Sequence, residues 1–148
     1  MHDLQRFLTE QDKDYQTALN EIKSGLKKNH WIWYVFPQLD GLVAKPSDNT
    51  KKFSIKNRNE AIAYYKHPIL RTRLREITQE LLKHKKKNIQ QIMDEVDSVK
   101  LRSCMTLFDY ISSDETSLFR EVLDQYFSGQ ADQKTIEILS RDNKNPLI

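Results

Sequence analysis

The chain has 148 residues, of which 38% are hydrophobic and 30% are charged. A chain of this length can bury one continuous core, and its apolar residues are spread along the whole sequence, which excludes an intrinsically disordered protein. The net charge of +3 comes from 24 basic and 21 acidic residues, which indicates a mixed surface rather than the one-signed field of a dedicated nucleic-acid binder. Three glycines are too few for the many tight turns of an all-β protein.

The cysteine content and the N-terminal residues indicate where the protein works. Its one cysteine, Cys104, cannot form an internal disulfide, which favours a reducing compartment. The first residues show no basic segment followed by an apolar run, and no stretch reaches the ~18 apolar residues of a membrane span. We therefore expect a cytoplasmic protein that makes no contact with a membrane.

Two helices are predicted at the start of the chain. Asp3 is placed to cap a short helix that carries Leu4, Phe7 and Leu8. A second helix follows the polar residues 12–14 and ends near Gly25. Its apolar residues recur at helical spacing and are Tyr15, Ala18, Leu19, Ile22 and Leu26.

The next segment, residues 30–38, reads HWIWYVFPQ and holds both tryptophans of the chain. It contains two alternating sets of apolar residues: Trp31, Trp33 and Val35, and Ile32, Tyr34 and Phe36. Because both sets are apolar, the pattern predicts an extended segment buried on two faces. Pro37 ends it, since the residue before a proline avoids helical geometry.

A long loop is predicted over residues 40–52, which read DGLVAKPSDNTKK without any apolar period. Its length is at the upper edge of what compact domains contain without a purpose. A mobile lid is one interpretation of such a segment, and a plain surface loop is the simpler one.

The rest of the chain predicts a series of amphipathic helices. The clearest signal is the spacing of Leu70, Leu74, Ile77 and Leu81. The predicted helices run from Asn57 to Lys66, from Pro68 to His84, over residues 89–96, from Asp97 to Ile111, from Leu118 to Gly129, and from Asp132 to Leu139.

These patterns predict a mainly α fold. We expect a single domain over residues 1–148, with about seven to eight helices and one buried extended aromatic segment. Its core should span residues 4–140, with a flexible loop at 40–52 and a C-terminal tail at 141–148.

Most motifs that identify an enzyme are absent from the sequence. There is no glycine-rich phosphate loop, no paired C-x-x-C and no H-E-x-x-H or G-x-S-x-G motif. The four histidines lack the spacing of metal ligands, so we expect neither a metal site nor a cofactor. Nucleic-acid binding is the last-ranked hypothesis, and it would use Arg71, Arg73, Arg75 and Lys85 to Lys87.

Three clusters are candidates for a site, and each has a structural alternative. In the aromatic segment, His30 and Gln38 bracket rings such as Trp33 and Phe36, an arrangement that suits either a core segment or a platform for a flat ligand. Asn57 and Glu60 have the spacing of a capping box, which explains the glutamate without a substrate. Glu60 is otherwise a carboxylate available for acid–base chemistry.

The third cluster lies in the helix predicted from Asp97. Lys100 and Ser103 fall on one flank of its apolar stripe. A lysine there either lies along the surface or holds an anion in a cleft. Cys104 lies within the stripe itself, which favours a buried, inert thiol over a nucleophile.

Four stretches of the sequence are distinctive: HWIWYVFPQLDGL from residue 30, EAIAYYKHPILRTRL from residue 60, VDSVKLRSCMTLF from residue 96, and VLDQYFSGQADQKTIEIL from residue 122. They resemble a bacterial family of small helical proteins catalogued as domain of unknown function 1810, some members of which carry the label calpastatin. The resemblance covers about residues 4–140.

The order of elements is also similar, more distantly, to the NADAR (YbiA-like) family of N-glycosidases. That similarity implies a NADAR-like helical fold and a nucleotide-like ligand, such as ADP-ribose or a ribosyl phosphate. Glu60 would be the catalytic carboxylate, with Tyr64 following it on the same helix. The implied ligand-binding residues are His30, Trp33, Phe36, Gln38, Tyr64, Lys100 and Ser103.

Two functions therefore compete. In the first, the chain is an N-glycosidase or a binding protein, and the rings at 30–38, Glu60 and Lys100 share one cavity. In the second, it is a helical interaction module, monomeric or homodimeric, whose aromatic patch at 30–38 docks a partner.

Overall fold

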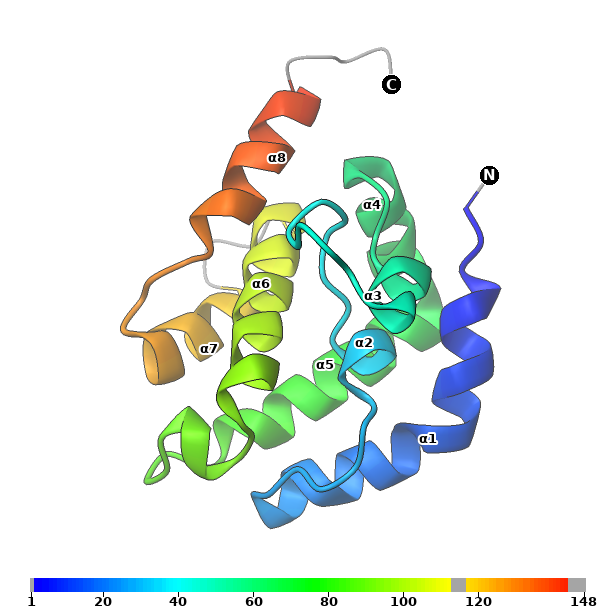
Figure 1. The fold of residues 1–148 in the computed structure, drawn as a ribbon. Coiled ribbons are helices and arrows are strands. Elements are labelled where there is room, and N and C mark those ends of the chain that lie inside the picture. The colour runs from blue at the N-terminus through cyan, green and yellow to red at the C-terminus, as the bar shows by residue number, and fades with distance from the viewer. Residues whose placement is uncertain (1, 113–116, 144–148) are drawn as a thin grey trace.

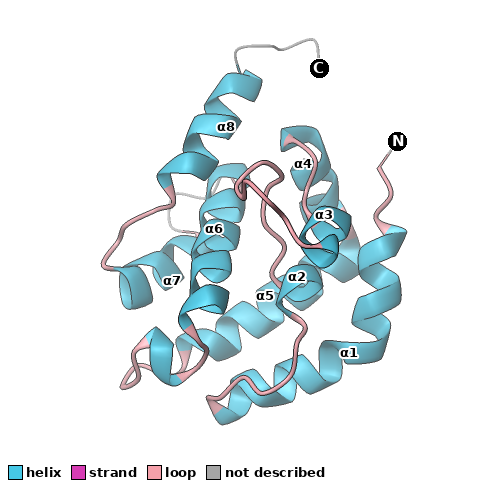
Figure 2. Cartoon of the chain, in the orientation of Figure 1, coloured by secondary structure: helices cyan, strands magenta, loops and turns pink. Residues whose placement is uncertain are grey.

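α-Helices make up nearly all the regular structure in the computed structural model, which describes residues 2–112 and 117–143 (Figures 1 and 2). Within these residues the β-structure is one isolated parallel bridge between Leu39 and Ile55. The helices are α1 (Gln5–Ser24), α2 (Ile32–Val35), α3 (Asp48–Phe53), α4 (Arg58–Lys66), α5 (Pro68–Leu82), the 3-10 turn η1 (Ile89–Gln91), α6 (Glu95–Ile111), α7 (Leu118–Phe127) and α8 (Gln133–Asn143). The prediction of a mainly α domain is confirmed.

Helix α6 lies at the centre of the fold and packs against α2, α4, α7 and α8, while α5 runs across α1, α4 and α7 (Figure 1). A chain of ring contacts joins these layers. Phe7 contacts Tyr64 with centroids 5.1 Å apart, Tyr64 contacts Phe108 at 5.3 Å, and Phe108 contacts Phe119 at 5.9 Å. All four residues are fully buried, so the rings form a rigid core beneath the surface residues of α4 and α6.

Helix α1 is one continuous helix, so the prediction of two separate helices at 4–8 and 15–25 is wrong. Asp12 and Lys13 lie exposed on its outer side, while Gln11 continues the buried stripe between Phe7 and Tyr15. Gln11 is stabilised there because its Nε2 atom donates hydrogen bonds to the Tyr34 carbonyl and the Tyr64 hydroxyl, at 2.7 and 3.0 Å. The helix ends at Gly25, as expected, where φ is +83°.

The aromatic segment at 30–38 is buried, as predicted, but it is not extended, so that part of the prediction is wrong. Residues 32–35 form the short helix α2, and Phe36, with φ −123° and ψ 70°, ends it before Pro37. Since both alternating sets of residues are apolar, the sequence pattern does not distinguish a buried strand from a buried helical turn. Five residues of the segment are at most 6% exposed: Trp31, Ile32, Tyr34, Val35 and Phe36.

A buried carboxylate holds the chain entering this segment. Glu21 accepts hydrogen bonds from the backbone N–H groups of Lys28 and Asn29, at 2.7 and 3.0 Å. It also accepts from the Asn29 side chain at 2.5 Å and from Trp31 Nε1 at 2.9 Å. Burial alone would raise the pKa of Glu21, but these donors outweigh it and lower the pKa from 4.5 to about 2.

The segment at 40–52 is a loop only in its first part. Residues 48–53 form α3, whose start is capped by the Ser47 hydroxyl as it accepts from the Thr50 N–H at 3.2 Å. The loop is joined to its surroundings by backbone bonds: Ile55 N–H donates to the Gln38 carbonyl and Asp40 N–H donates to the Ile55 carbonyl, both at 2.8 Å. These bonds fix the backbone at Gln38 and so the direction of its side chain.

Other helix ends follow the predictions with small shifts. Asn57 caps α4, since its Oδ1 atom accepts from the Glu60 N–H at 2.9 Å. Asp94, and not Asp97, caps α6. Helix α8 continues through Asn143, so the predicted tail at 141–148 begins as helix, and its residues 144–148 lie outside the described part of the chain. None of the described helices is both long and apolar enough to span a bilayer.

Candidate functional site

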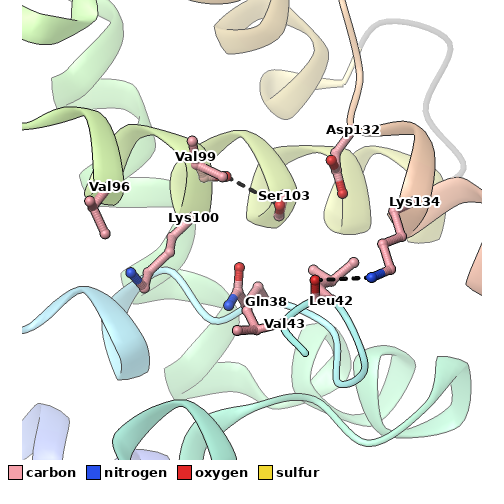
Figure 3. Close-up of a pocket in the computed structure, with 9 residues that line it drawn as sticks. All are labelled: Gln38, Leu42, Val43, Val96, Val99, Lys100, Ser103, Asp132 and Lys134. Carbon is pink, nitrogen blue, oxygen red and sulfur yellow. Dashed lines mark hydrogen bonds between the residues drawn. The ribbon is translucent and has the colours of Figure 1, made fainter. Parts of the chain in front are cut away.

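A cleft of about 390 Å³ opens between the outer face of α6, the chain from Gln38 to Val43 and the start of α8 (Figure 3). Its volume is within the ~300–1,000 Å³ usual for small-molecule sites. Nine residues line it: Gln38, Leu42, Val43, Val96, Val99, Lys100, Ser103, Asp132 and Lys134. The three lining segments are far apart in sequence, so the cleft exists only in the folded chain.

Valines form much of its apolar wall and are unusually exposed. Val96 is 65% exposed, Val99 57% and Val43 44%. Val96 and Val99 are three residues apart on α6, so they lie on the same face of that helix. An exposed apolar face beside polar groups is typical of a ligand or partner site, because the fold itself gains nothing from leaving these side chains in water.

Gln38 supplies the first polar group of the cleft. The residue is only 8% exposed, and its carboxamide forms no hydrogen bond with any described residue, although its backbone carbonyl is bonded to Ile55. In Figure 3 the carboxamide points from the loop toward α6. Because no described residue occupies its hydrogen-bonding groups, this side chain is available to a ligand as both donor and acceptor.

Lys100 and Ser103 extend from α6 to the same cleft, as their shared flank on the helical wheel predicts. The Ser103 hydroxyl donates to the Val99 carbonyl at 3.2 Å, which leaves its oxygen able to accept a further bond. Lys100 is partly buried and forms no ion pair within the described residues. Its ammonium group is therefore free to bind an anion.

At the other end of the cleft, Asp132 and Lys134 are already engaged. The Asp132 carboxylate caps α8 by accepting from the Thr135 N–H at 3.1 Å and from its hydroxyl at 2.5 Å. The Lys134 ammonium donates to the Leu42 carbonyl at 3.2 Å, which ties α8 to the loop. These contacts shape the cleft and leave Lys100 as its free cation among the described residues.

Trp33 and Phe36 lie beside the cleft, but no space for a ring lies against them. Together with Gln38 and Lys100 they line a neighbouring hollow of about 10 Å³, roughly the volume needed for one water molecule. Phe36 is 1% exposed, and its ring contacts that of Trp31 at a centroid distance of 6.2 Å. Phe36 is therefore not available for stacking, and Trp33, which is partly exposed, does not line the cleft.

His30 and Tyr64 do not reach the cleft. His30 borders a different pocket, of about 260 Å³, with residues that include Asp94 and Asp97. Tyr64 is fully buried in the core, and burial raises the pKa of its hydroxyl. The structure therefore separates these two residues from Gln38, Lys100 and Ser103.

Glu60 lies apart from the cleft in an ion pair with Arg6. Its Oε1 atom is 2.5 Å from Arg6 Nη2 and accepts from the Lys56 N–H at 3.1 Å. Both side chains are buried, with exposed fractions of 4% for Glu60 and 9% for Arg6. Arg6 also donates to the carbonyls of Lys52 and Ser54, at 2.8 and 2.9 Å, so the pair joins α1 to the start of α4.

Among the described residues, a reactive cysteine and a metal-binding cluster would be the alternative sites. Cys104 is buried and burial raises the pKa of its thiol well above its ordinary value, so a reactive thiolate is disfavoured. The described residues also contain no group of three or more histidine, cysteine or acidic side chains that could hold a metal ion.

Sequence reasoning identified Gln38, Lys100 and Ser103 but missed the remaining lining residues. Val96 and Val99 carried a usable signal, since two valines three residues apart interrupt the polar face of a helix. Leu42, Val43 and Lys134 carried none, because their place in the cleft depends on how the loop and α8 approach α6.

Comparisons with known proteins place the chain among relatives whose function is not described. The sequence profile of the family "Protein of unknown function (DUF1810)" matches residues 1–139. The crystal structure of the conserved hypothetical protein Rv1873 from Mycobacterium tuberculosis is 36% identical, with a TM-score of 0.88, and the match covers 93% of this chain and 96% of that one. A search of proteins with curated functions gives no match.

Proposed function

The chain belongs to the DUF1810 family, and from the geometry of its cleft we propose that it binds a small, phosphate-bearing, nucleotide-like ligand there. One observation carries the proposal. Two polar side chains without partners among the described residues, the carboxamide of Gln38 and the ammonium of Lys100, face the same cleft, and exposed valines line it.

Each group has a distinct part in this proposal. Lys100 binds a phosphate group, and the apolar surroundings strengthen that attraction relative to bulk water. Val43, Val96 and Val99 contact a flat apolar group such as a nucleobase, whose faces they would remove from water. Gln38 offers one acceptor and two donor hydrogens to the polar edge of that group or to a ribose hydroxyl.

The proposal favours binding over N-glycosidic cleavage. Hydrolysis of a glycosidic bond normally requires a carboxylate beside the scissile bond. Glu60 does not line the cleft, and the one carboxylate among the lining residues, Asp132, already caps α8. A hydrolytic version of the hypothesis would have to use Asp132 or bring the ligand to Glu60.

An interaction module would have to use a different surface from the aromatic patch at 30–38. Trp31, Tyr34 and Phe36 are buried and Trp33 is partly buried, so these rings do not form an exposed aromatic patch. If a protein partner or a second copy binds, the valines beside the cleft are the exposed apolar surface available on this side.

A ligand screen with matched variants tests the proposal. Thermal unfolding is measured with AMP, ADP-ribose and ribose 5-phosphate, and titration calorimetry gives the affinity of any ligand that raises the midpoint. A ligand at about 100 times its Kd stabilises the fold by about 2.7 kcal/mol. We expect Lys100→Gln and Gln38→Ala to lose this effect and Lys23→Gln, an exposed lysine on α1, to keep it.

Two results would refute the proposal. One is no stabilisation by any phosphate-bearing compound, and the other is equal binding by the Lys100→Gln variant. Sedimentation of the unliganded protein addresses the alternative, since concentration-dependent association that Val99→Ser abolishes would indicate docking instead.

A further inference from the structure

Another cavity, of about 470 Å³, lies where the end of α4, the first half of α5 and the end of α6 meet. It shares no lining residue with the cleft described above. The residues around it are Ile62, Tyr65, Lys66, Arg71, Arg75, Ile111 and Ser112. Of these seven described residues three are cations and none is acidic, which distinguishes this cavity from the others described.

Among the residues that the structure describes, no carboxylate balances the three cations. Within the described residues, Lys66, Arg71 and Arg75 form no ion pair. Arg71 and Arg75 are one turn apart on α5, where like charges repel each other. Arg73, on the same helix, shows the contrast, because its Nη2 atom is 2.8 Å from Asp12.

The two arginines are arranged around a rigid support. Arg75 Nη1 donates to the Tyr65 hydroxyl at 3.0 Å, and the Arg71 guanidinium lies 5.7 Å from the centre of the Tyr65 ring. That ring in turn contacts the buried rings of Phe108 and Phe119, with centroids 6.0 and 5.7 Å apart. Guanidinium groups held in this way lose little freedom when they bind an anion.

We propose that this cavity is a second anion site, which binds the phosphate or pyrophosphate group of a small molecule. Arg71 and Arg75 supply planar sets of N–H donors that match phosphate oxygens, and Lys66 adds a third positive charge. Bound phosphate also relieves the repulsion between the two arginines. Ile62 and Ile111 form an apolar border for the rest of the ligand.

The surroundings favour a small anion over a nucleic-acid strand. A strand would need a continuous basic track from the arginines to residues 85–87. Arg73 is paired with Asp12, and Lys87 donates to the Gly25 carbonyl at 2.9 Å, so two of the cations of such a track are already engaged. Such a track is therefore interrupted, whereas Lys66, Arg71 and Arg75 meet at one cavity.

Titration calorimetry with inorganic pyrophosphate tests the site. We expect the Arg71→Gln/Arg75→Gln double variant to lose at least about tenfold in affinity, since each lost bond is charge-assisted. Lys85→Gln removes one positive charge, as Arg71→Gln alone does, from an exposed residue outside the cavity and should keep the affinity within about twofold. Lys100→Gln should also keep it, which separates this site from the cleft.

Arg71→Gln alone provides a second variant that is safe for the fold, because Arg71 is exposed and its guanidinium donates no hydrogen bond to a described residue. It should weaken pyrophosphate binding while its urea unfolding matches that of the original chain. The inference is overturned if pyrophosphate does not bind, if Lys85→Gln loses as much affinity, or if Lys100→Gln alone abolishes binding. A single-stranded oligonucleotide that binds these arginines more tightly than pyrophosphate at the same ionic strength would also overturn the small-molecule assignment.

Discussion

Replacing Glu60 by glutamine separates a structural glutamate from a catalytic one. Glu60→Gln keeps the size of the side chain and removes the charge that faces Arg6 at 2.5 Å. Because both partners are buried, the change leaves the arginine charge without its counter-ion. Breaking a buried ion pair on one side typically costs about 3–5 kcal/mol.

The structure places this variant near the lower end of that range. Arg6 keeps the carbonyls of Lys52 and Ser54 as acceptors, and the new amide oxygen can still accept from the Lys56 N–H. We therefore expect a loss of about 3 kcal/mol in the free energy of unfolding. For a chain of this size each kcal/mol lowers the Tm by about 2–4 °C, so the Tm should fall by about 6–12 °C.

Urea unfolding followed by circular dichroism measures this loss, with Glu137→Gln as an exposed control on α8 that should unfold like the original chain. The affinity of any ligand for the cleft should be unchanged in folded Glu60→Gln protein. If Glu60→Gln is as stable as the original chain but loses binding or turnover, the structural role of Glu60 is refuted and a functional role is supported.

Three further outcomes follow from the fold. The pKa of Glu21 is about 2 in the folded protein, compared with an ordinary value of 4.5. Its hydrogen bonds therefore stabilise the fold fully above about pH 5, and this contribution of about 3 kcal/mol is lost as the pH falls toward 2. Acid titration of Glu21→Gln should show a correspondingly shallower loss of stability. Phe108→Ala should cost about 3–5 kcal/mol in urea unfolding, because it removes a fully buried ring at the centre of the ring contacts. The Cys104 thiol should react with a thiol reagent only at the rate of unfolding, and a fast reaction of the folded protein would contradict its burial.

Helical spacing predicted most of the fold because the buried stripes of α5, α6 and α7 are regular. The spacing of Leu70, Leu74 and Ile77, for example, marks a face that is fully buried in the structure. Where a segment is apolar on every side, as around Trp31 and Phe36, no period remains to distinguish a helical turn from a strand. Gln11 shows the opposite case, since a polar residue continues a buried stripe through hydrogen bonds that the sequence does not reveal.

The candidate site was only partly predictable for a similar reason. Lys100 and Ser103 lie near each other because both are on one flank of α6, which a helical wheel shows directly. Glu60 matched a capping pattern, yet its main partner, Arg6, is 54 residues away and no local pattern indicates the contact. Val96 and Val99 share a face of α6, but Leu42, Val43 and Lys134 reach that face only through tertiary approach, which is why the cleft as a whole was not predicted.

The most direct test of ligand binding in the cleft is an amide NMR titration of the folded protein with AMP. Saturable shift changes should concentrate on the residues that surround the cleft, above all Gln38, Val99, Lys100 and Ser103. No saturable change at these residues, or changes confined to other surfaces, would contradict the assignment of this cleft as the site of a phosphate-bearing ligand.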